Sequence, residues 1–572
     1  MNRKKAILAI FMMAFLIIIG FVFPSIWKSQ KGSKKSETEN TQHDNNENTE
    51  TEQAENNESI SLQEFEALEY FFSKEQVKLF QEELTSYLKN VKQMSLTSIR
   101  FLADDTTYPN ASDINFLLFL VPLLATLWIH EKLKWGGVFL RNTILLIASY
   151  WFYAQLSPTY VVLLGAITLL NWISGKSLLQ QKRKWVCGTT VILSLLPLIC
   201  YKYAHFFIVD VLGLANENFA TWVLPIGISF FTFQALTYTI DIYRGKIKEK
   251  APLIDFMLFV SFFPNILSGP IEKGRNLLPQ LHKLHPITND NLLRGSELFA
   301  WGLFKKVVVA DRIAIYTNSV FEHPDFYSGN SNLLAIALYS IQIYCDFSGY
   351  TDMAIGVAKM MGFRLNDNFR FPYFSTTIRQ FWKKWHISLT SWFTEYLYIA
   401  CGGNRVPKWR WYINISLVFL VSGLWHGAAW TFIFWGALHA VLYLIEHISG
   451  LKNQFLSFWR IWVQGIYVYI VVSLAWVFFR ANTFNDATAM INGVFRDWGR
   501  QYTTASLMGF VLMLAALALF IILEILAYKK VITITESENN PYDGKNLAFL
   551  VITLLSISLL GQSGAQFVYF KF

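Results

Sequence analysis

A long succession of apolar segments constrains this chain more than any other feature. From residue 114 onward, about a dozen such segments follow one another, separated by short polar linkers. Of the 572 residues, 53% are hydrophobic and only 16% are charged, whereas soluble domains carry about 25% charged residues. A segment in lipid must satisfy its backbone hydrogen bonds internally, as an α-helix does. The sequence therefore predicts an all-α polytopic membrane protein with its membrane domain at residues 113–572.

The charges of the linkers indicate an orientation. Linkers 131–134 and 176–184 are basic, and the turn 155–160 between them carries no charge. Cytoplasmic loops are enriched in Lys and Arg, so we expect the basic linkers in the cytoplasm. The basic residues behind the net charge of +9 also lie in short runs between apolar segments. This pattern predicts contact with the lipid bilayer and no binding to nucleic acid.

Two stretches of the membrane domain interrupt the apolar pattern. Residues 265–270 and 402–407 are rich in polar residues, Gly and Pro. We expect broken or re-entrant backbone at both places. Such backbone is tolerated at membrane depth only inside protein.

A separate hydrophobic segment precedes the membrane domain. Residues 1–27 hold a basic start and an apolar run about long enough to span a bilayer. A cleaved signal peptide is the competing interpretation, but no small-x-small cleavage pattern follows the run. We therefore favour an uncleaved transmembrane anchor that begins in the cytoplasm. Residues 28–112 are then extracytoplasmic.

Two different stretches follow this anchor. Residues 28–59 are expected to form a disordered tether, because positions 36–58 hold eight acids and no Lys or Arg. Residues 60–112 are expected to form a small helical segment, since Ser73 and Gln76 match a capping box. Apolar residues at helical spacing follow it: Val77, Phe80, Leu84, Leu88 and Val91. This stripe is either a core or a surface for a partner.

The strongest candidate for chemistry lies in the stretch 422–430. Its His426 is the one titratable side chain in the apolar run 413–438, and an ionisable group in a membrane segment is a functional hypothesis by default. Gly423 and Gly427 form a GxxxG step that allows a second helix to approach closely. Burial favours the neutral imidazole, which can accept a proton. A histidine that only packs and bonds to a carbonyl is the structural alternative.

Two further histidines follow in the same region. On a continuous helix, His439 would point about 220° away from His426, which favours a structural role. His447 lies near the expected helix end, and we expect it at the membrane interface.

A second candidate site combines cations and aromatic rings at the edge of an apolar region. The stretch 379–388 holds His386 among Arg379, Trp382, Lys383 and Lys384. Its cations could attract the phosphates of an acyl carrier. An aromatic belt with snorkelling cations is the alternative.

Acidic residues and cysteines give a weaker signal. Asp346 and Asp352 lie in apolar surroundings, where they would orient other polar groups or line a tunnel. No further carboxylates cluster there and the four cysteines lack metal-ligand spacing, so we expect no bound metal or cofactor. The sequence also lacks a Walker A loop, a Rossmann fingerprint, a G-x-S-x-G elbow and HExxH. Acyl chemistry would thus depend on the membrane histidines.

Four motifs occur in order along the chain: LPIGISFFTFQ at 224–234, SGPI at 268–271, DFSGYTD at 346–352 and GLWHG at 423–427. Together they resemble the membrane-bound O-acyltransferase family, in its alginate and peptidoglycan O-acetyltransferase branch. The resemblance runs from about residue 114 to residue 572. It implies a ring of tilted helices around a tunnel, in a bacterial plasma membrane.

The resemblance also implies roles for single residues. His426 matches the family's near-invariant histidine and would act as general base, and His386 matches the second histidine. From their residue types, we also expect Asp346, Trp382 and the cations Arg379, Lys383 and Lys384 on the donor side or along the tunnel. Relatives end in an aromatic tail whose tyrosine is proposed to carry the acyl group, and Tyr569 occupies that place. An interfacial anchor is the alternative for Tyr569.

The implied reaction carries an acetyl group from acetyl-CoA, a donor substrate, across the membrane. The expected partners are a polysaccharide acceptor and an extracytoplasmic SGNH-type acetyltransferase or hydrolase-like protein. A rival with the same fold transfers D-alanine to teichoic acids, but the motifs at 226–231 and 346–352 favour the acetylating branch. A rival of another class is a glycan exporter. Exporters often contain internal repeats, and we find none here.

Overall fold

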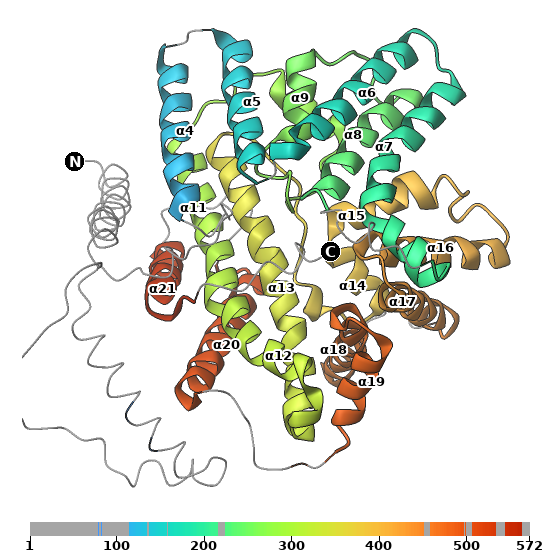
Figure 1. Cartoon of the computed structure of the whole chain (residues 1–572). Helices are drawn as coiled ribbons and strands as arrows, with labels where there is room; N and C mark the ends of the chain where they lie inside the picture. Colours follow the sequence, from blue (N-terminus) through green and yellow to red (C-terminus); the bar gives the residue numbers. More distant parts are fainter. Residues whose placement is uncertain are drawn as a thin grey trace, which may run out of the picture. The chain divides into compact units, whose positions relative to one another are not determined.

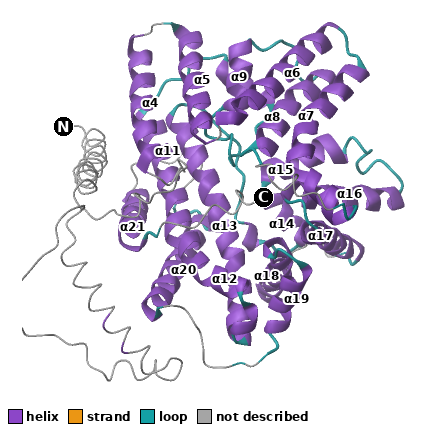
Figure 2. Cartoon of the chain, viewed as in Figure 1, coloured by secondary structure: helices purple, strands orange, loops and turns teal. Residues whose placement is uncertain are grey.

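The computed structural model describes residues 78, 82, 114–133, 136–156, 158–214, 224–450, 458–496, 498, 506–532 and 544–562. The anchor 1–27, the tether 28–59, nearly all of the segment 60–112, and Tyr569 therefore lie outside the described residues. Residues 101–499 and 513–572 form one compact unit, which contains all four sequence motifs. Its described residues form helices and no strand, as predicted for an all-α membrane protein (Figure 2).

Helices α6, α7, α9 and α10 pack around α8. Helix α5 packs against α9, and α6 and α7 both pack against α8, which is buried along almost its whole length (Figure 1). The bounds are Ile114–Leu133 for α4, Gly137–Leu156 for α5, Pro158–Tyr160 for η3, Val161–Gln180 for α6, Lys184–His205 for α7, Phe206–Val211 for the π-helix η4, Ile228–Tyr243 for α8, Leu253–Ser261 for α9 and Gly274–Leu281 for α10.

An irregular stretch at 262–273 separates α9 from α10 and includes residues 265–270, where irregular backbone was predicted. Asn265 and Ser268 are each only 1% exposed. This backbone is tolerated because protein, and not lipid, surrounds it. The stretch 402–407 between η9 and α16 is also irregular, but its Asn404 and Arg405 are exposed.

The remaining helices begin with α11, which runs antiparallel to α13. Their bounds are Asn289–Leu303 for α11, Phe304–Ala310 for the π-helix η6, Asp311–Glu322 for α12, Pro324–Phe326 for η7, Gly329–Met360 for α13, Pro372–Phe374 for η8, Ile378–Lys384 for α14, Ile387–Phe393 for α15, Thr394–Tyr398 for the π-helix η9, Lys408–His426 for α16, Trp430–Ile448 for α17, Phe458–Arg480 for α18, Phe484–Gly493 for α19, Leu507–Tyr528 for α20 and Gly544–Leu560 for α21.

Two pairs of glycines bring α11 and α13 into close contact (Figure 1). A Cβ on Gly302 would lie 2.4 Å from the carbonyl oxygen of Gly349, and a Cβ on Gly295 would lie 2.6 Å from that of Gly356. The two glycines on each helix are seven residues apart, about two helical turns, so both lie on the face that contacts the other helix. Small residues of this kind permit close helix packing in membranes.

The chain does not continue as one helix through the GLWHG motif. Helix α16 ends at His426, residues 427–429 are not helical, and α17 starts at Trp430. Helix α17 then folds back on α16, because Gly423 and Gly436 approach each other there without side chains. The predicted GxxxG contact is therefore confirmed for Gly423. Gly427 instead lies in the turn, against the ring of Phe432.

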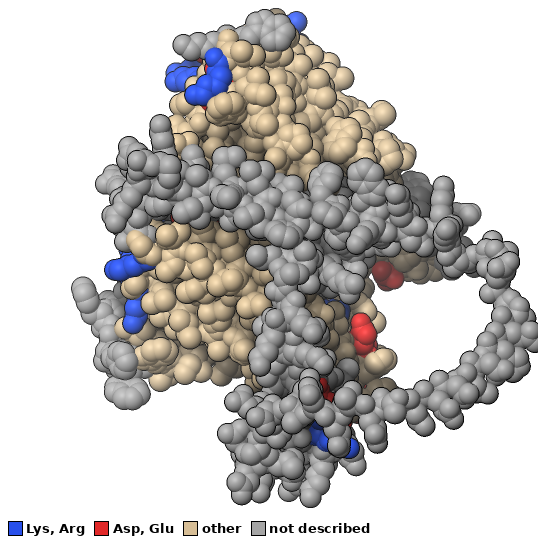
Figure 3. Space-filling model, turned by 90° about the vertical axis from the view of Figure 1, so that its left-hand side faces the viewer, with Lys and Arg blue, Asp and Glu red and all other residues tan. Residues whose placement is uncertain are grey.

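Six helices among the described residues are long and apolar enough to cross a membrane. They are Phe116–Leu133, Pro158–Gln180, Lys184–Val211, Trp430–Ile448, Ile461–Arg480 and Leu507–Tyr528. Large apolar side chains on them are exposed, as expected for contact with lipid; Ile192 is 65% exposed. On the face shown in Figure 3, most of the described surface carries no charged side chain. The chain is thus a multi-pass membrane protein.

Candidate active site

The fold brings His386 and His426 together. Their ring centroids lie 6.5 Å apart, a separation at which the two imidazoles do not hydrogen-bond to each other. Both are buried, with 1% and 4% of their surface exposed. His386 is the residue directly before α15, and His426 is the last residue of α16, so both histidines lie at helix ends.

Asn368 fixes the tautomer of His386. Its side-chain oxygen accepts hydrogen bonds from His386 Nδ1 at 3.1 Å, from the Ser388 N–H at 3.1 Å and from the Ser388 hydroxyl at 2.9 Å. A backbone N–H can only donate, so the amide atom facing it must be the oxygen, and an oxygen there requires a hydrogen on Nδ1. The neutral His386 ring therefore carries its lone pair on Nε2, the nitrogen that can act as a base.

The backbone at His386 is strained. Its φ of 44° is in the left-handed region, which costs a residue with a side chain about 1–3 kcal/mol. The backbone N–H of Ile387 bonds to the carbonyl of Asn368 at 2.9 Å and helps to hold this turn. Ser388 also accepts a bond from the N–H of Ile271, which ties the turn to the SGPI motif.

Aromatic rings enclose His426. The rings of Trp425, Trp435 and Phe479 lie 5.0, 5.2 and 5.2 Å from its ring, measured between centroids. Trp425 also lies 5.9 Å from His386 and contributes to both environments. This enclosure excludes bulk water from the imidazole and favours its neutral form.

A cavity of about 330 Å³ begins at the residue after His426. Residues 427–429, the turn between α16 and α17, form one of its walls. Lys202 lies in another wall and donates a hydrogen bond to the carbonyl of Trp425 at 2.6 Å. The other lining residues are Tyr201, Leu224, Thr431, Phe432, Arg480, Ala481 and Asn482.

The cations expected on the donor side do not all converge on His386. The Arg379 guanidinium contacts His447 Nδ1 at 2.9 Å and lies over the ring of Tyr443. Lys384 donates to the carbonyls of Phe371 and Phe374. Lys383 is exposed.

Trp382 and His439 form part of the packing behind the histidine pair. Trp382 Nε1 donates to His439 Nδ1 at 3.3 Å. The ring of Trp435 lies 5.2 Å from that of His426 and 5.0 Å from that of His439, so it separates the two histidines. The continuous helix assumed for the phase of His439 was wrong, because the chain turns at 427–429.

Asp346 belongs to a buried ionic cluster. Its carboxylate lies 2.7 Å from Lys306 Nζ, which is also 2.7 Å from Asp311. Next to it, Lys305 pairs with Asp352. The π-helix η6 places the two consecutive lysines against α13, which explains how two acids are tolerated in an apolar segment.

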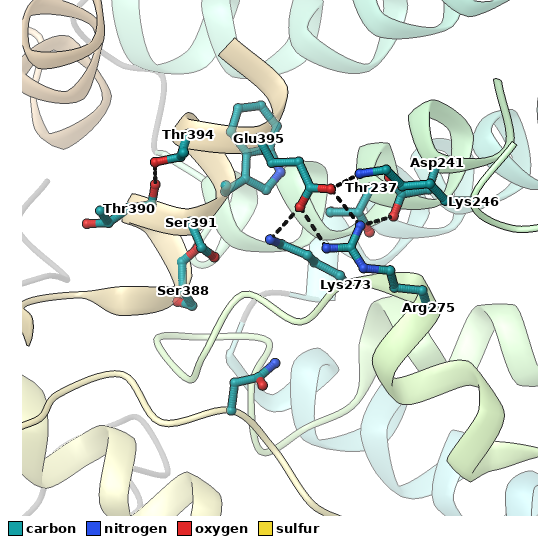
Figure 4. A network of polar contacts seen from close by, with 12 residues as sticks. Thr237, Asp241, Lys246, Lys273, Arg275, Ser388, Thr390, Ser391, Thr394 and Glu395 are labelled. Carbon is teal, nitrogen blue, oxygen red and sulfur yellow. Dashed lines mark hydrogen bonds and ion pairs between the residues drawn. The ribbon is translucent and has the colours of Figure 1, made fainter. Parts of the chain in front are cut away.

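A second ionic cluster surrounds Glu395 (Figure 4). No motif in the sequence indicated it. Glu395 pairs with Lys246, with Lys273 at 2.7 Å and with Arg275 at 2.7 Å. Arg275 also lies 3.1 Å from Asp241. Glu395 is remote from these partners in the sequence, so no local spacing could have revealed the cluster.

Glu395 keeps its negative charge at neutral pH, and its cluster lies close to a basic linker. Burial raises the pKa of the Glu395 carboxyl, but hydrogen bonds from Arg275, Lys246 and Lys273 outweigh burial and hold the pKa well below its usual range. A Cβ on Gly245 would lie 2.9 Å from Lys182 Nζ, so the cluster lies at the same end of the helices as linker 176–184.

Comparisons with known proteins identify relatives for most of the chain. Residues 46–141 match a family described as "Domain of unknown function (DUF5038)". The probable alginate O-acetylase AlgI of Azotobacter vinelandii is 37% identical over 399 residues, which are 67% of this chain and 78% of that protein. The peptidoglycan O-acetyltransferase of Helicobacter pylori is 34% identical, covering 61% of this chain and 73% of that protein.

A third relative carries a different acyl group in its name. The teichoic acid D-alanyltransferase of Bacillus subtilis is 30% identical over 349 residues, which are 58% of this chain and 87% of that protein. The matches cover 78%, 73% and 87% of the lengths of these three relatives. This chain belongs to the membrane-bound O-acyltransferase family.

Proposed function

We propose that this chain moves an acetyl group from acetyl-CoA in the cytoplasm across the membrane, for O-acetylation of a cell-wall or secreted polysaccharide. One observation carries the proposal: two buried histidines lie 6.5 Å apart, and His386 has a fixed tautomer. The names of the alginate and peptidoglycan relatives support an O-acetyltransferase acting on polysaccharide or cell wall.

In this proposal His426 acts as general base. It takes the proton of an attacking hydroxyl while the oxygen bonds to the thioester carbonyl carbon. The carbon–sulfur bond then breaks, and the proton passes to the departing thiolate. General base catalysis of this kind contributes about 10²–10⁴ in rate. His386, with its lone pair on Nε2, would bond to the hydroxyl or the thiol and orient it.

The attacking hydroxyl in this proposal is that of Tyr569. A phenol with a pKa of about 10 reacts poorly alone at neutral pH and needs a base. The phenyl ester that forms has a good leaving group, suited to passing acetyl to an extracytoplasmic SGNH-type partner. That partner would then acetylate the glycan.

The donor would enter from the side of the basic linkers. The Glu395 cluster holds three cations against two acids there, which leaves a surplus of positive charge. Three further cations would add to the attraction for the phosphates of acetyl-CoA: the exposed Lys383 and the half-buried Arg379 and Lys384. Such charges raise the local concentration of an anionic substrate. Trp382 and Asp346 would support the tunnel wall.

Transfer of D-alanine is the second candidate, favoured by the 30% identity with the Bacillus subtilis relative. Cells with and without this chain, labelled separately with acetyl and D-alanyl precursors, distinguish the two. We expect acetate, and no D-alanine, to be lost from the glycan when the chain is absent. Loss of D-alanine alone would replace the acetyl proposal. Loss of glycan export would replace acyl transfer altogether.

A further inference from the structure

The backbone directly after the SGPI motif is fixed to helix α8. The N–H of Glu272 donates to the side-chain oxygen of Gln234 at 3.2 Å, and the N–H of Gly274 donates to the hydroxyl of Thr237 at 3.1 Å. Gln234 and Thr237 are three residues apart, so they lie on one face of α8. Figure 4 shows Thr237 beside the Glu395 cluster. The backbone at Glu272 is therefore anchored to a buried helix.

The side chain of Glu272 clamps an irregular segment of the chain. Its two carboxylate oxygens accept hydrogen bonds from the backbone N–H of Asn366 at 2.6 Å and from the Asn366 side chain at 2.8 Å. Residues 363–371 form no α-helix, so no helical hydrogen bond holds this N–H. Glu272 is only 1% exposed, and a hydrogen bond in such low-dielectric surroundings is stronger than in water. A carboxylate acceptor strengthens both bonds further.

The clamped segment leads to the groups that hold His386. Two residues after Asn366, the side-chain oxygen of Asn368 accepts a hydrogen bond from His386 Nδ1 at 3.1 Å. The same loop also reaches the far side of the histidine, because the N–H of Ile271 donates to the Ser388 hydroxyl at 3.1 Å. Adjacent residues of one loop thus support both sides of His386.

We propose that Glu272 is a positioning residue for His386, which acts through Asn366 and Asn368. The proposal rests on the proposed function in giving His386 a part in acyl transfer. By holding Asn366, the carboxylate keeps the Asn368 oxygen within hydrogen-bond distance of Nδ1 and so keeps the lone pair of His386 on Nε2. A weaker acceptor at position 272 would let the segment move and allow the other tautomer.

The strength of the clamp depends on the charge of Glu272. Burial raises the pKa of its carboxyl to about 7, against hydrogen bonds from Asn366 and Asn276 and the positive charge of Lys273. The Lys273 ammonium is itself held by Glu395 at 2.7 Å. Because the pKa is raised, the carboxyl is protonated below about pH 7 and ionised above it. A protonated carboxyl is neutral, as the side chain of glutamine is, so the clamp should weaken in acid.

The rate of thiol release from acetyl-CoA in a single turnover tests the proposal, with the full chain in lipid nanodiscs. At about pH 8.5, Glu272→Gln should release thiol about tenfold more slowly than wild type, because a neutral acceptor bonds less strongly than a carboxylate. At about pH 5.5 the two rates should be equal, since wild type is then also neutral at this position. The acetyl-CoA concentration that gives half the maximal rate should not change, because the clamp holds His386 and not the donor.

The matched control is Glu297→Gln on α11. Glu297 is also buried, and burial raises the pKa of its carboxyl to about 7, but its charged neighbours are Arg294 and Lys359. The rate of Glu297→Gln should follow that of wild type at both pH values.

The tautomer of His386 gives a second readout, which needs no activity. In protein that contains isotope-labelled histidine, nuclear magnetic resonance distinguishes a protonated from an unprotonated ring nitrogen, and a His386→Gln sample assigns the signals. We expect one tautomer, with the hydrogen on Nδ1, in wild type at about pH 8.5 and a mixture of tautomers in Glu272→Gln. Asn366→Ala, at an exposed position, removes one of the two bonds and should also give a mixture.

Two results would overturn the proposal. One is a single, unchanged His386 tautomer in both Glu272→Gln and Asn366→Ala. The other is a rate of Glu272→Gln that equals that of wild type at about pH 8.5, or that is lowered equally at both pH values, as a purely structural role would give. Absence of thiol release from wild type, together with a His386 tautomer that changes in Glu272→Gln, would instead remove the proposed function and leave the positioning role.

Discussion

Replacing Asn368 by leucine should disable the site without removing either histidine. The Asn368 oxygen accepts three hydrogen bonds, one from His386 and two from Ser388. At about 0.5–1.5 kcal/mol net for each bond, their loss costs about 1.5–4.5 kcal/mol in total. If this cost falls on the active geometry, the transfer rate decreases about 10- to 10³-fold, since 1.4 kcal/mol is a factor of ten.

The assay is the acetyl content of the glycan, divided by the amount of protein inserted in the membrane. Asn368→Asp keeps an oxygen that accepts from Nδ1 and should retain more activity than Asn368→Leu. Asn414→Leu is the matched control, because Asn414 is also buried and bonded, but to the carbonyls of Cys401 and Gly403. Asn414→Leu should lower the amount of inserted protein and leave the activity per inserted molecule unchanged. Equal activity of Asn368→Leu and wild type would refute the role of Asn368, as would an aspartate variant no better than leucine.

Three further predictions concern charge, packing and the tail. Glu395→Gln should lower the melting temperature. Since the pKa of Glu395 is held below its usual range, the carboxylate contributes stability above about pH 4.5, and this contribution is lost as the pH falls further. The difference in melting temperature between wild type and variant should therefore be constant from about pH 6 to 8 and shrink in acid. Gly349→Ala places a Cβ 2.7 Å from the Gly302 carbonyl oxygen and should cost about 1–3 kcal/mol of stability, whereas Gly165→Ala, with open space around it, should not lower the melting temperature. Tyr569→Phe should abolish glycan acetylation and the acetyl adduct that mass spectrometry would find on the wild-type C-terminal peptide; full activity would assign Tyr569 to an interfacial anchor.

The sequence predicted the fold class and singled out both histidines, because ionisable groups in apolar runs are rare and costly. It could not predict that His386 and His426 meet. The turn at 427–429 has two alanines, which are strong helix formers, and no proline. A single glycine is tolerated within a helix, so Gly427 alone did not mark the break. In the structure, the ring of Phe432 fills the space that a Cβ on Gly427 would occupy.

The polar partners around the site were also beyond prediction from one sequence. The hydrogen-bond partners of three polar residues are distant in the sequence: those of Asn368, Lys202 and Glu395. Helices in lipid are apolar on the outside as well as the inside, so periodicity does not reveal which face carries the site. The Glu395 cluster and the cavity beside His426 consequently appear only when the helices are placed in space.

The most direct test of the proposed mechanism is the activity of His426→Gln, beside His426→Ala, in cells that lack the native protein. Glutamine fills a similar space and forms hydrogen bonds but cannot act as a base at neutral pH. We predict that both variants insert and accumulate like wild type and that glycan acetylation per inserted molecule decreases at least about 10²-fold in both. Near-normal acetylation in His426→Gln would contradict the general-base assignment, and failure of both variants to accumulate would identify His426 as a packing residue.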